Sequence, residues 1–416
     1  MDELTTMRRH LQQVYAAALA AVDGRGCVRR ALQQQPASGP VYTVAIGKAA
    51  PAMLRGAVDT LGEALSGGLL ITKHGHADGA ALPDSVRLME AGHPWPDQAS
   101  LAAGEALLDF VRALPADARV LFLISGGSSS LVEVLPEDMA LDELHKANDW
   151  LLGSGLDIHA VNQVRKALSC IKGGRLAQQL QGRAARVLLI SDVPGDDPAT
   201  IGSGLLVPEI PLATEAPWNL SGGLPDWLEA RLDQAPPAPE EDDPCFETVE
   251  LEIVATLGDA TAAAARQGRE LGYNVYEHHP FIRGDALLLG RQLAAELLQG
   301  PKVLHVWGGE TTVRLPNNPG RGGRNQHLAL SAAVELDGRK NVALLAAGTD
   351  GSDGPTQDAG ALVDGATVRR GRMAGMNARR CLAAANAGSF LEASGDLIQT
   401  GPTGTNVMDL MLGLRR

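Results

Sequence analysis

The sequence is poor in aromatic residues, which make up only 3% of its 416 residues. A core with so few rings has to be filled by Ala, Leu and Val, a composition that suits helices packed on a parallel sheet. The four cysteines are widely scattered and form no CxxC pair: Cys27, Cys170, Cys245 and Cys381. This spacing indicates neither a zinc site nor a disulfide framework, and it is typical of reduced thiols in a cytosolic protein.

Long apolar segments and excess positive charge are also missing. No window approaches the roughly 18 uncharged apolar residues of a membrane span. Residues 1–22 carry charges on a helical period instead of the apolar stretch and cleavage site of a signal peptide. We therefore expect a cytoplasmic protein without membrane contact. The net charge of −13 argues against non-specific nucleic-acid binding, so any anionic ligand requires a local positive pocket.

Glycine, by contrast, occurs 48 times, above the average usage of about 7%. Such an excess without a repeat indicates tight turns or close approaches of the backbone to a ligand. The chain is longer than the roughly 250–300 residues at which single cores stop growing, so two domains are expected. Residues 208–244 are rich in proline and end in an acidic run, which we interpret as an irregular crossing segment. We place the domains at residues 1–243 and 244–416.

Short, continuous apolar runs alternate with helical stretches along the chain. In the N-terminal part they predict strands at Val41–Ile46, Gly68–Thr72, Val120–Ser125 and Val187–Ser191, and helices at Ala49–Thr60, Gln98–Ala113 and Val164–Leu180. Continuous apolar runs fit strands buried on both faces, so this part is predicted to be α/β, with a doubly wound, mostly parallel sheet. A smaller α/β C-terminal domain is predicted by strands at Val249–Leu257, Tyr273–Tyr276, Val303–Trp307 and Val342–Ala347, and by helices at Asp259–Leu271, Asp285–Leu298 and Asn325–Leu336.

Ligands of doubly wound sheets bind at the carboxyl ends of the strands, where this sequence carries polar motifs. Gly47 and Lys48 follow the first strand, and a lysine there would meet an anion at a helix N-terminus. Residues 125–130, Ser-Gly-Gly-Ser-Ser-Ser, offer backbone N–H groups and hydroxyls that suit a phosphate. Ser130 replaces the last glycine of a GxSxG elbow, which argues against a serine hydrolase. A solvated lysine and a structural turn are the alternatives.

A basic cluster follows within fourteen residues: Asn162, Arg165, Lys166, Lys172 and Arg175. The first three occupy one helix face, so the cluster is either an anion site or an exposed basic face. Asp192 stands at the tip of the fourth strand. An aspartate at that place suits a general base or a Mg²⁺ ligand.

The C-terminal part has its own polar loops. Gly309 and Glu310 follow a strand, and residues 320–326 place two arginines before a helix, which suits an anion. Asp350 and Asp353 lie in a loop that fails the EF-hand template, so their role is either catalytic Mg²⁺ binding or an Asp-Gly turn. Residues 401–406, and the pair of histidines at 74 and 76, are interpreted as turns.

Ten segments in this order resemble the glycerate 2-kinases with a C-terminal MOFRL domain, some members of which carry the label hydroxypyruvate reductase. The segments are residues 45–49, 72–76, 91–97, 124–130, 162–177, 191–196, 307–312, 322–326, 348–354 and 403–407. The resemblance covers nearly the whole chain. It implies ATP-dependent phosphorylation of D-glycerate at the 2-hydroxyl, giving 2-phosphoglycerate and ADP, with Mg²⁺, in a cleft between the domains.

The resemblance also implies roles for particular residues. Lys48 and Arg324 are expected as the essential cations, and Asp192 as the base or a metal ligand. Nucleotide phosphates are expected at Gly47, Gly126, Gly127, Ser128, Ser129, Gly309 and Glu310. Glycerate is expected at Asn162, Arg165, Lys172 and Asn325, and metal at Asp192, Asp350 and Asp353. Exchange of the nucleotide and glycerate loops stays open as an alternative. The expected partners are glycerate and ATP, with no nucleic acid and no membrane; the oligomeric state stays open, a homodimer included.

Two other functions compete with this one. An NAD(P)H-dependent hydroxypyruvate reductase would need a nicotinamide site, usually built on GxGxxG. No such motif follows the strands, since Gly47 precedes Lys48 and Ala49, and Gly126 precedes Gly127 and Ser128. A non-catalytic anion-binding module is the second alternative, and the number of Lys, Arg and Asp residues at strand ends argues against it.

Overall fold

A computed structural model describes residues 3–77, 82–156, 158–209, 224–299 and 303–416. The chain divides into two compact units. One, which we call the parallel unit, comprises Cys27–Val254, and the other, the mixed unit, combines Met1–Gly26 with Ala255–Arg416. The sequence-based division at residue 243 differs from these units, because it assigned the first 26 residues to the N-terminal domain.

The parallel unit is built on a six-stranded sheet in the order β3-β2-β1-β4-β5-β6. Its strands are β1 (Val41–Ile46), β2 (Leu65–Lys73), β3 (Val86–Ala91), β4 (Arg119–Ile124), β5 (Ala184–Ile190) and β6 (Val249–Ala255). The pairs β1–β2, β2–β3, β1–β4 and β4–β5 are parallel. The strand order reverses direction between β1 and β4, and sheets of this kind bind ligands at that switch point. The sequence had assigned β6 to the other domain.

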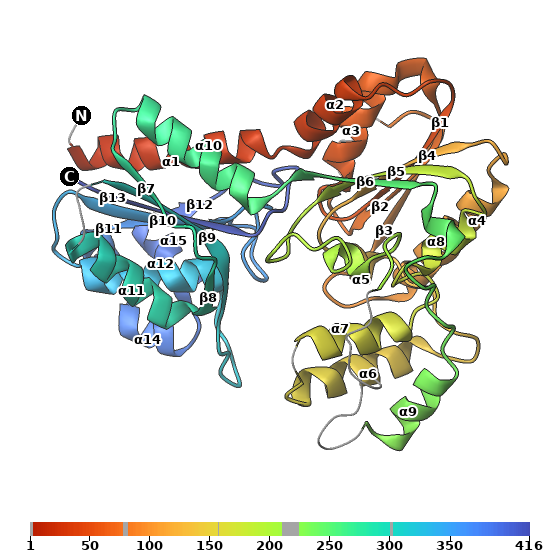
Figure 1. Ribbon diagram of the computed structural model, residues 1–416. Helices are drawn as coiled ribbons and strands as arrows, with labels where there is room; N and C mark the ends of the chain where they lie inside the picture. The colour runs from red at the N-terminus through yellow and green to blue at the C-terminus, as the bar shows by residue number, and fades with distance from the viewer. Residues whose placement is uncertain (1–2, 78–81, 157, 210–223, 300–302) are drawn as a thin grey trace. The chain divides into compact units, whose positions relative to one another are not determined.

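Helices cover both faces of this sheet (Figure 1). Val44 and Ile46 of β1 pack with Leu107 of α4 (Gln98–Ala113) and Leu176 of α8 (Arg175–Gln179). Because side chains alternate along a strand, the residues between them face the other side, which α3 (Ala50–Leu61) covers. Shorter elements complete the unit: α2 (Gly24–Gln34), α5 (Ser128–Leu131), η1 (Gly62–Ala64), η2 (Ile201–Ser203) and η3 (Pro244–Phe246).

A separate group of helices has its own apolar core. It consists of α6 (Leu141–Gly153), α7 (Ile158–Ala167) and α9 (Asp226–Asp233), whose leucines and valines cluster together. Two predictions were wrong here. The expected helix over 164–180 is broken, because Gly173 and Gly174 adopt left-handed conformations between α7 and α8. The proline-rich segment also contains the helix α9, which packs Leu228 and Leu232 into this core. Residues 210–223 of the segment lie outside the described residues.

The mixed unit has a seven-stranded sheet in the order β12-β11-β10-β13-β9-β7, with β8 also paired to β9. Its strands are β7 (Val275–Glu277), β8 (Ile282–Asp285), β9 (Leu304–Thr312), β10 (Val342–Gly348), β11 (Gly360–Asp364), β12 (Leu397–Ile398) and β13 (Asp409–Arg415). Neighbours from β12 to β9 are antiparallel, whereas β7 and β8 run parallel to β9. The second sheet thus combines antiparallel and parallel pairs, whereas the strand pairs named above for the first sheet are all parallel.

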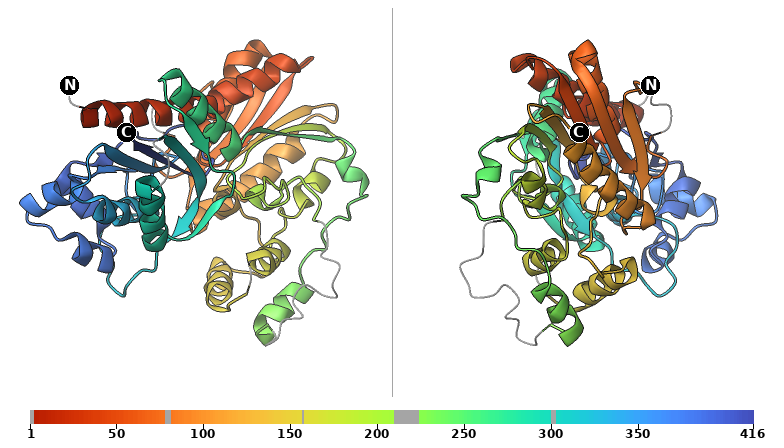
Figure 2. Two further views of the ribbon diagram at one scale, coloured as in Figure 1. Left: turned by 60° about the vertical axis from the view of Figure 1, so that its left-hand side comes forward. Right: turned by 90° about the vertical axis from the view of Figure 1, so that its right-hand side faces the viewer.

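Two helical layers enclose the mixed sheet (Figures 1 and 2). On one face lie α1 (Glu3–Ala21) and α10 (Leu257–Glu270), and on the other α11 (Ala286–Gln299) and α12 (Arg324–Leu336). Around α12 are α13 (Thr367–Met373), α14 (Ala378–Ala383) and α15 (Ala387–Ser394). Within the described ranges, no helix has both the length and the apolar character needed to cross a membrane.

Candidate active site

The loops at the switch point of the parallel sheet are fixed by hydrogen bonds between strand ends. Lys48 N–H donates to the carbonyl of Gly126 at 3.0 Å, and Ala49 N–H donates to Ser125 Oγ at 3.1 Å. Thr72 Oγ1 donates to the carbonyl of Gly47 at 3.0 Å. The structure therefore brings Gly47, Lys48 and Gly126 together where three neighbouring strands end, and their role in binding stays a prediction.

Next to Gly127, the loop after β3 also reaches this place. Gly127 adopts a left-handed conformation, with φ of 87°. A Cβ atom added to Gly127 would lie 3.0 Å from His93 Cδ2 and 3.3 Å from Lys48 Cγ. The stem of Lys48 and the ring of His93, from the loop after β3, thus flank this glycine. Ser128 behind it is fully buried.

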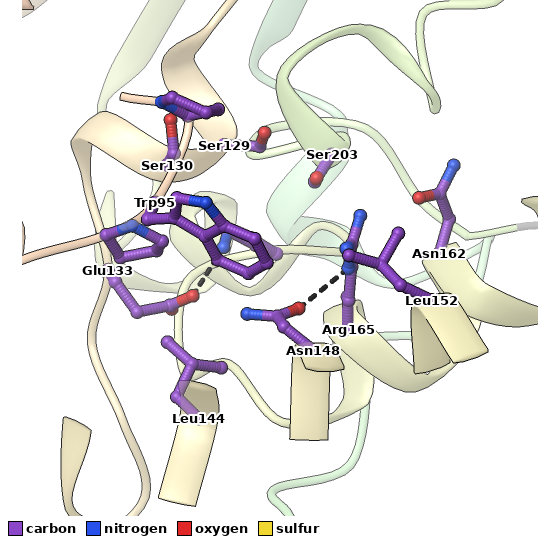
Figure 3. A pocket seen from close by; sticks show the side chains of 13 residues that line it. Trp95, Ser129, Ser130, Glu133, Leu144, Asn148, Leu152, Asn162, Arg165 and Ser203 are labelled. Atoms are coloured by element: carbon purple, nitrogen blue, oxygen red, sulfur yellow. Dashed lines mark hydrogen bonds and ion pairs between the residues drawn. The ribbon is translucent and has the colours of Figure 1, made fainter. Parts of the chain in front are cut away.

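A pocket of about 300 Å³ adjoins this loop (Figure 3). Its polar wall comes from α5, α6, α7 and the loops next to them: Ser129, Ser130, Glu133, Asn148, Asn162, Arg165, Lys172 and Ser203. Its apolar rim is formed by Pro94, Trp95, Pro96, Leu144 and Leu152. The three N-terminal residues predicted to bind glycerate therefore line one pocket, and Ser129 joins it to the phosphate-type loop.

The cations of the basic cluster differ in their partners. Lys172 forms an ion pair with Glu133, and both side chains are buried; Ser169 Oγ donates to the same carboxylate at 2.6 Å. Arg165 Nε instead donates to the amide oxygen of Asn148 at 2.8 Å. Burial lowers the pKa of Arg165.

The remaining cations of the cluster have structural partners. Lys166 pairs with Glu209 at 3.2 Å, and Arg175 donates to the carbonyls of Lys166, Lys172 and Pro236. Lys166, Lys172 and Arg175 are all less than a tenth exposed. The alternative of an exposed basic face was therefore wrong for these three.

Asp192 follows β5 after one intervening residue, Ser191, and is half-buried. Because the carboxyl ends of parallel strands meet at one edge of a sheet, Asp192 lies at the same edge as Gly47 and Gly126. Its role as a general base or a metal ligand stays a prediction.

In the mixed unit, Arg324 begins α12 and is held by two carboxylates. Asp409, at the start of β13, accepts from Nε at 2.6 Å and from Nη2 at 3.1 Å, and Glu310 Oε1 lies 2.6 Å from Nη1. Burial acts to lower the pKa of Arg324, but Asp409 and Glu310 outweigh it and raise the pKa. The guanidinium is therefore fixed and permanently charged.

Three other predicted residues of this unit have structural contacts. Asp353 is buried and accepts the backbone N–H groups of Asn325 at 3.0 Å and Gln326 at 2.8 Å, at the start of α12. Burial raises the pKa of Asp353 to about 7, although these two hydrogen bonds oppose the shift. Asp350 Oδ1 accepts from Ser352 N–H at 2.9 Å, as in an Asp-Gly turn. Among the described residues, no group of three or more His, Cys, Asp or Glu is arranged to hold a metal.

Gly309 and Glu310 differ from the expected loop, because β9 continues to Thr312 instead of ending at Trp307. A Cβ atom on Gly309 would lie 2.0 Å from the carbonyl oxygen of Ile282 in β8. A neighbouring strand therefore explains this glycine without a ligand.

Several pocket residues had no predicted role. Trp95 lies within a motif that carried the resemblance, and Ser203 stands between Gly202 and Gly204, a spacing that could have indicated a loop at a ligand. Nothing in the sequence distinguishes Asn148 from other polar residues of a helix. Its role depends on the packing of α6 against α7.

Comparison with known proteins gives consistent results. A family model described as a domain of unknown function, DUF4147, matches residues 10–218, and the MOFRL family model matches residues 303–409. A D-glycerate 2-kinase from Thermotoga maritima is 37% identical over 384 residues, 90% of each chain. A protein of Agrobacterium vitis named as a hydroxypyruvate reductase is 36% identical over 97% of this chain and 93% of its own. A crystal structure of glycerate kinase from Thermotoga maritima matches with a TM-score of 0.84 and 33% identity, over 99% of this chain and 100% of that chain.

Proposed function

This chain belongs to the glycerate 2-kinase family with a MOFRL domain, and we propose that it transfers the γ-phosphoryl group of ATP to the 2-hydroxyl of D-glycerate. A bond forms between the glycerate 2-oxygen and the γ-phosphorus while the bond from that phosphorus to the β-phosphate oxygen breaks, giving 2-phosphoglycerate and ADP. The observation that carries this proposal is the pocket in which Arg165 faces a neutral amide, next to the phosphate-type loop of Gly126–Ser129. Small-molecule substrates and four cysteines outside any disulfide fit a cytoplasmic enzyme.

The parallel unit supplies the binding groups in this proposal. Backbone N–H groups around Gly47, Gly126 and Gly127, with the hydroxyls of Ser128 and Ser129, bind the phosphates of ATP. Asn162 and Arg165 bind glycerate, and Lys172 shapes the pocket wall, since Glu133 neutralises its charge. Gly309, Glu310 and Asn325 stay predictions as ligand contacts.

Lys48 and Arg324 are the proposed catalytic cations. Phosphoryl transfer spreads negative charge over the equatorial oxygens, and positioned cations stabilise that charge. The fork between Arg324 and Asp409 supports this role, because a guanidinium already oriented in the protein loses little side-chain entropy when it meets the transferring group.

Asp192 is proposed to accept the proton of the 2-hydroxyl or to bind Mg²⁺. Proteins bind Mg²⁺ through one or two carboxylates plus substrate phosphates, so a single carboxylate at the strand ends fits the ion. Mg²⁺ would neutralise phosphate charge when it accompanies ATP. Asp350 fits the role of a Mg²⁺ ligand less well, because its Oδ1 accepts the backbone N–H of Ser352. Asp353 fits it least, because both oxygens of Asp353 accept backbone N–H groups.

Hydroxypyruvate reduction is not favoured by the loops. The strand order matches that of dinucleotide-binding sheets, but such sites need GxGxxG after the first strand and an acidic residue for the ribose. Here Lys48 and Ala49 follow Gly47, and β2 ends at Lys73. A lysine cannot accept the hydrogen bond of the NADH ribose hydroxyl, and for NADPH the missing GxGxxG after β1 is the argument against binding.

A coupled assay tests the proposal with the full-length chain, ATP and D-glycerate. We expect ADP release, and a product that enolase consumes without added phosphoglycerate mutase, since only 2-phosphoglycerate is its substrate. A separate reaction measures NADH consumption with hydroxypyruvate as the substrate. NADH consumption, or a product that requires the mutase, would contradict the proposal.

A further inference from the structure

Arg165 differs from Lys172, the other cation among the pocket-lining residues, in the charge of its partner. Lys172 and Lys166 each meet a carboxylate. Among the described residues, Arg165 meets only the amide oxygen of Asn148, 2.8 Å from its Nε (Figure 3). Over the part of the chain that the structure describes, no carboxylate lies within 4.0 Å of its guanidinium, and no second hydrogen bond is made.

A partly buried guanidinium that makes a single hydrogen bond, to a neutral group, is unfavourable unless a ligand completes it. Removing a cation from water costs free energy that an amide dipole only partly returns. The lowered pKa of Arg165 has the same cause, burial without a nearby anion. An arginine whose Nε is occupied still has its two terminal nitrogens, whose planar arrangement matches a carboxylate. The missing anion is therefore expected from a ligand in the pocket.

We infer that Asn148 is a positioning residue that orients Arg165 without neutralising it, so that the guanidinium binds the carboxylate of the substrate. This inference rests on the proposed function and adds a residue that no motif indicated. Asn148 is 6% exposed and projects from α6, while Arg165 comes from α7, so the contact joins the two helices at the pocket wall. The amide accepts from Nε and leaves the positive charge for the ligand.

The isosteric variant Asn148→Asp separates charge from shape. Its carboxylate would keep the hydrogen bond to Arg165 but form an internal ion pair that competes with the substrate. We expect the Kd and KM for D-glycerate to rise roughly 10- to 100-fold, in the range of close charge pairs. The KM for ATP should stay within about twofold, and kcat at saturating D-glycerate should change little, because Asn148 meets no reacting atom.

Asn148→Ala tests whether Asn148 acts through charge or only through shape. If its role were purely structural, the Ala variant would bind D-glycerate less tightly than the Asp variant. Asn148→Ala removes the orienting oxygen but leaves the charge of Arg165 available, so D-glycerate should bind less tightly than to the natural chain and more tightly than to Asn148→Asp. The matched control is Gln163→Glu, the same amide-to-acid change on α7. Gln163 is two residues from Arg165, does not line the pocket, and faces another side of the helix. This control should bind D-glycerate normally.

Calorimetric titration with D-glycerate alone, and with ADP alone, identifies the anion and needs no turnover. Weakened D-glycerate binding with unchanged ADP binding supports a carboxylate site. Weakened ADP binding alone, no binding of D-glycerate to the natural chain, or an Asn148→Ala defect at least as large as that of Asn148→Asp would overturn the inference. If Asn148→Asp does not fold, Arg165→Gln replaces it and should abolish D-glycerate binding. A chain that binds D-glycerate but releases no ADP would refute the proposed kinase activity instead.

Discussion

At the scale of single residues, the structure holds two arginines in different ways. Arg324 is fixed by the carboxylate of Asp409, which is 1% exposed, and its third nitrogen meets Glu310. Arg165 is oriented by an amide. A carboxylate keeps a guanidinium in place at the cost of its net charge, whereas an amide preserves the charge. Arg324 is thus already oriented for its proposed role, whereas Arg165 keeps its charge available for an anionic ligand.

Arg324→Ala should reduce kcat by about 10³-fold, because an arginine that stabilises the transferring phosphoryl group contributes on that order. The measurement is steady-state ADP release at saturating ATP and D-glycerate. The control is Arg321→Ala, which removes a neighbouring arginine whose partners are Asp358 and Glu392. The control should keep kcat within a few-fold, and an Arg324→Ala variant with more than about a tenth of the natural kcat would contradict the role of Arg324.

At the scale of elements, the loops after β1 and β4 approach each other closely at Gly47. A Cβ atom on this residue would lie 2.2 Å from Ser125 Oγ and 2.5 Å from the Ser125 carbonyl oxygen, and its φ is 129°. A side chain here would separate the strand ends that place Lys48 beside Gly127. The glycine is therefore required by packing between elements as well as by its own conformation.

We expect Gly47→Ala to lower both stability and kcat, since displacing Ser125 also moves the loop that carries Gly126 and Gly127. Gly75→Ala is the matched control, because Gly75 also has a positive φ but a Cβ atom there would meet none of the described residues within 4 Å. Both variants include backbone strain, of order 1 kcal/mol. Urea unfolding and ADP release measure the difference, and equal losses in the two variants would exclude the steric explanation.

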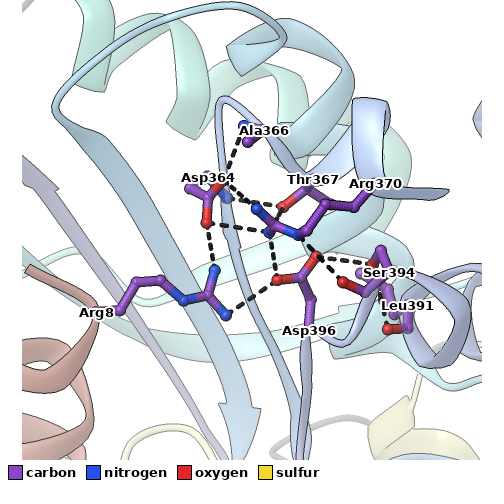
Figure 4. A network of polar contacts seen from close by, with 8 residues as sticks. All are labelled: Arg8, Asp364, Ala366, Thr367, Arg370, Leu391, Ser394 and Asp396. Carbon is purple, nitrogen blue, oxygen red and sulfur yellow. Dashed lines mark hydrogen bonds and ion pairs between the residues drawn. The ribbon is translucent and has the colours of Figure 1, made fainter. Parts of the chain in front are cut away.

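The helix α1 is joined to the end of β11 by a network of ion pairs (Figure 4). Asp364 and Asp396 are buried, and each meets both Arg8 from α1 and Arg370 from α13. Asp364 also accepts Ala366 N–H at 2.7 Å. Burial alone would raise the pKa of Asp364, but Arg370, this N–H and Arg8 lower it overall.

A lowered pKa in the folded state means that Asp364 stabilises the fold above its ordinary pKa, near 4, and that this contribution is lost as the pH falls below that value. Asp364→Asn should therefore cost about 3 kcal/mol of unfolding free energy at pH 7, as expected when one member of a buried pair is removed. The loss should shrink towards pH 3. Asp337→Asn is the control, because the exposed pair of Asp337 with Arg372 at 3.8 Å should contribute under about 1 kcal/mol. A pH-independent loss in urea titrations would contradict this account.

Local patterns predicted some elements to the residue. Val41–Ile46 and Gln98–Ala113 were exact, because a glycine ends the strand and Asp97 forms a capping box with Ser100 at the helix start. The same reasoning missed α9 and the strand β13, whose short apolar segments become ordered only by packing against distant elements. In the candidate site, the glycine loops and the basic cluster could be predicted because residue type alone indicates them as possible anion-binding groups. Asn148 was not, since an amide gains its role from one neighbour on another helix.

At the scale of the whole molecule, the mixed unit is discontinuous in sequence. The buried face of α1, which includes Met7, Leu11, Val14 and Tyr15, packs on α10 and β10, and Tyr15 Oη donates to the Gly348 carbonyl at 2.6 Å. Its hydrophobic period predicts a helix but cannot indicate which distant strand it covers. For this reason the sequence placed the first 26 residues in the wrong unit.

A cut-and-join experiment tests this assignment. A fragment of residues 255–416 lacks α1, so the apolar surface under Leu11 is uncovered and the carboxylates of Asp364 and Asp396 lose Arg8 and keep only Arg370. We expect weak or no cooperative unfolding of this fragment in urea. Joining residues 1–26 to residue 255 by a flexible linker of about 15 residues should restore a cooperative transition at higher urea concentration. Leu11→Asp in the joined chain should return it to the behaviour of the fragment, because it buries an unpaired charge. Equal midpoints for the fragment and the joined chain would show that α1 is dispensable to this unit.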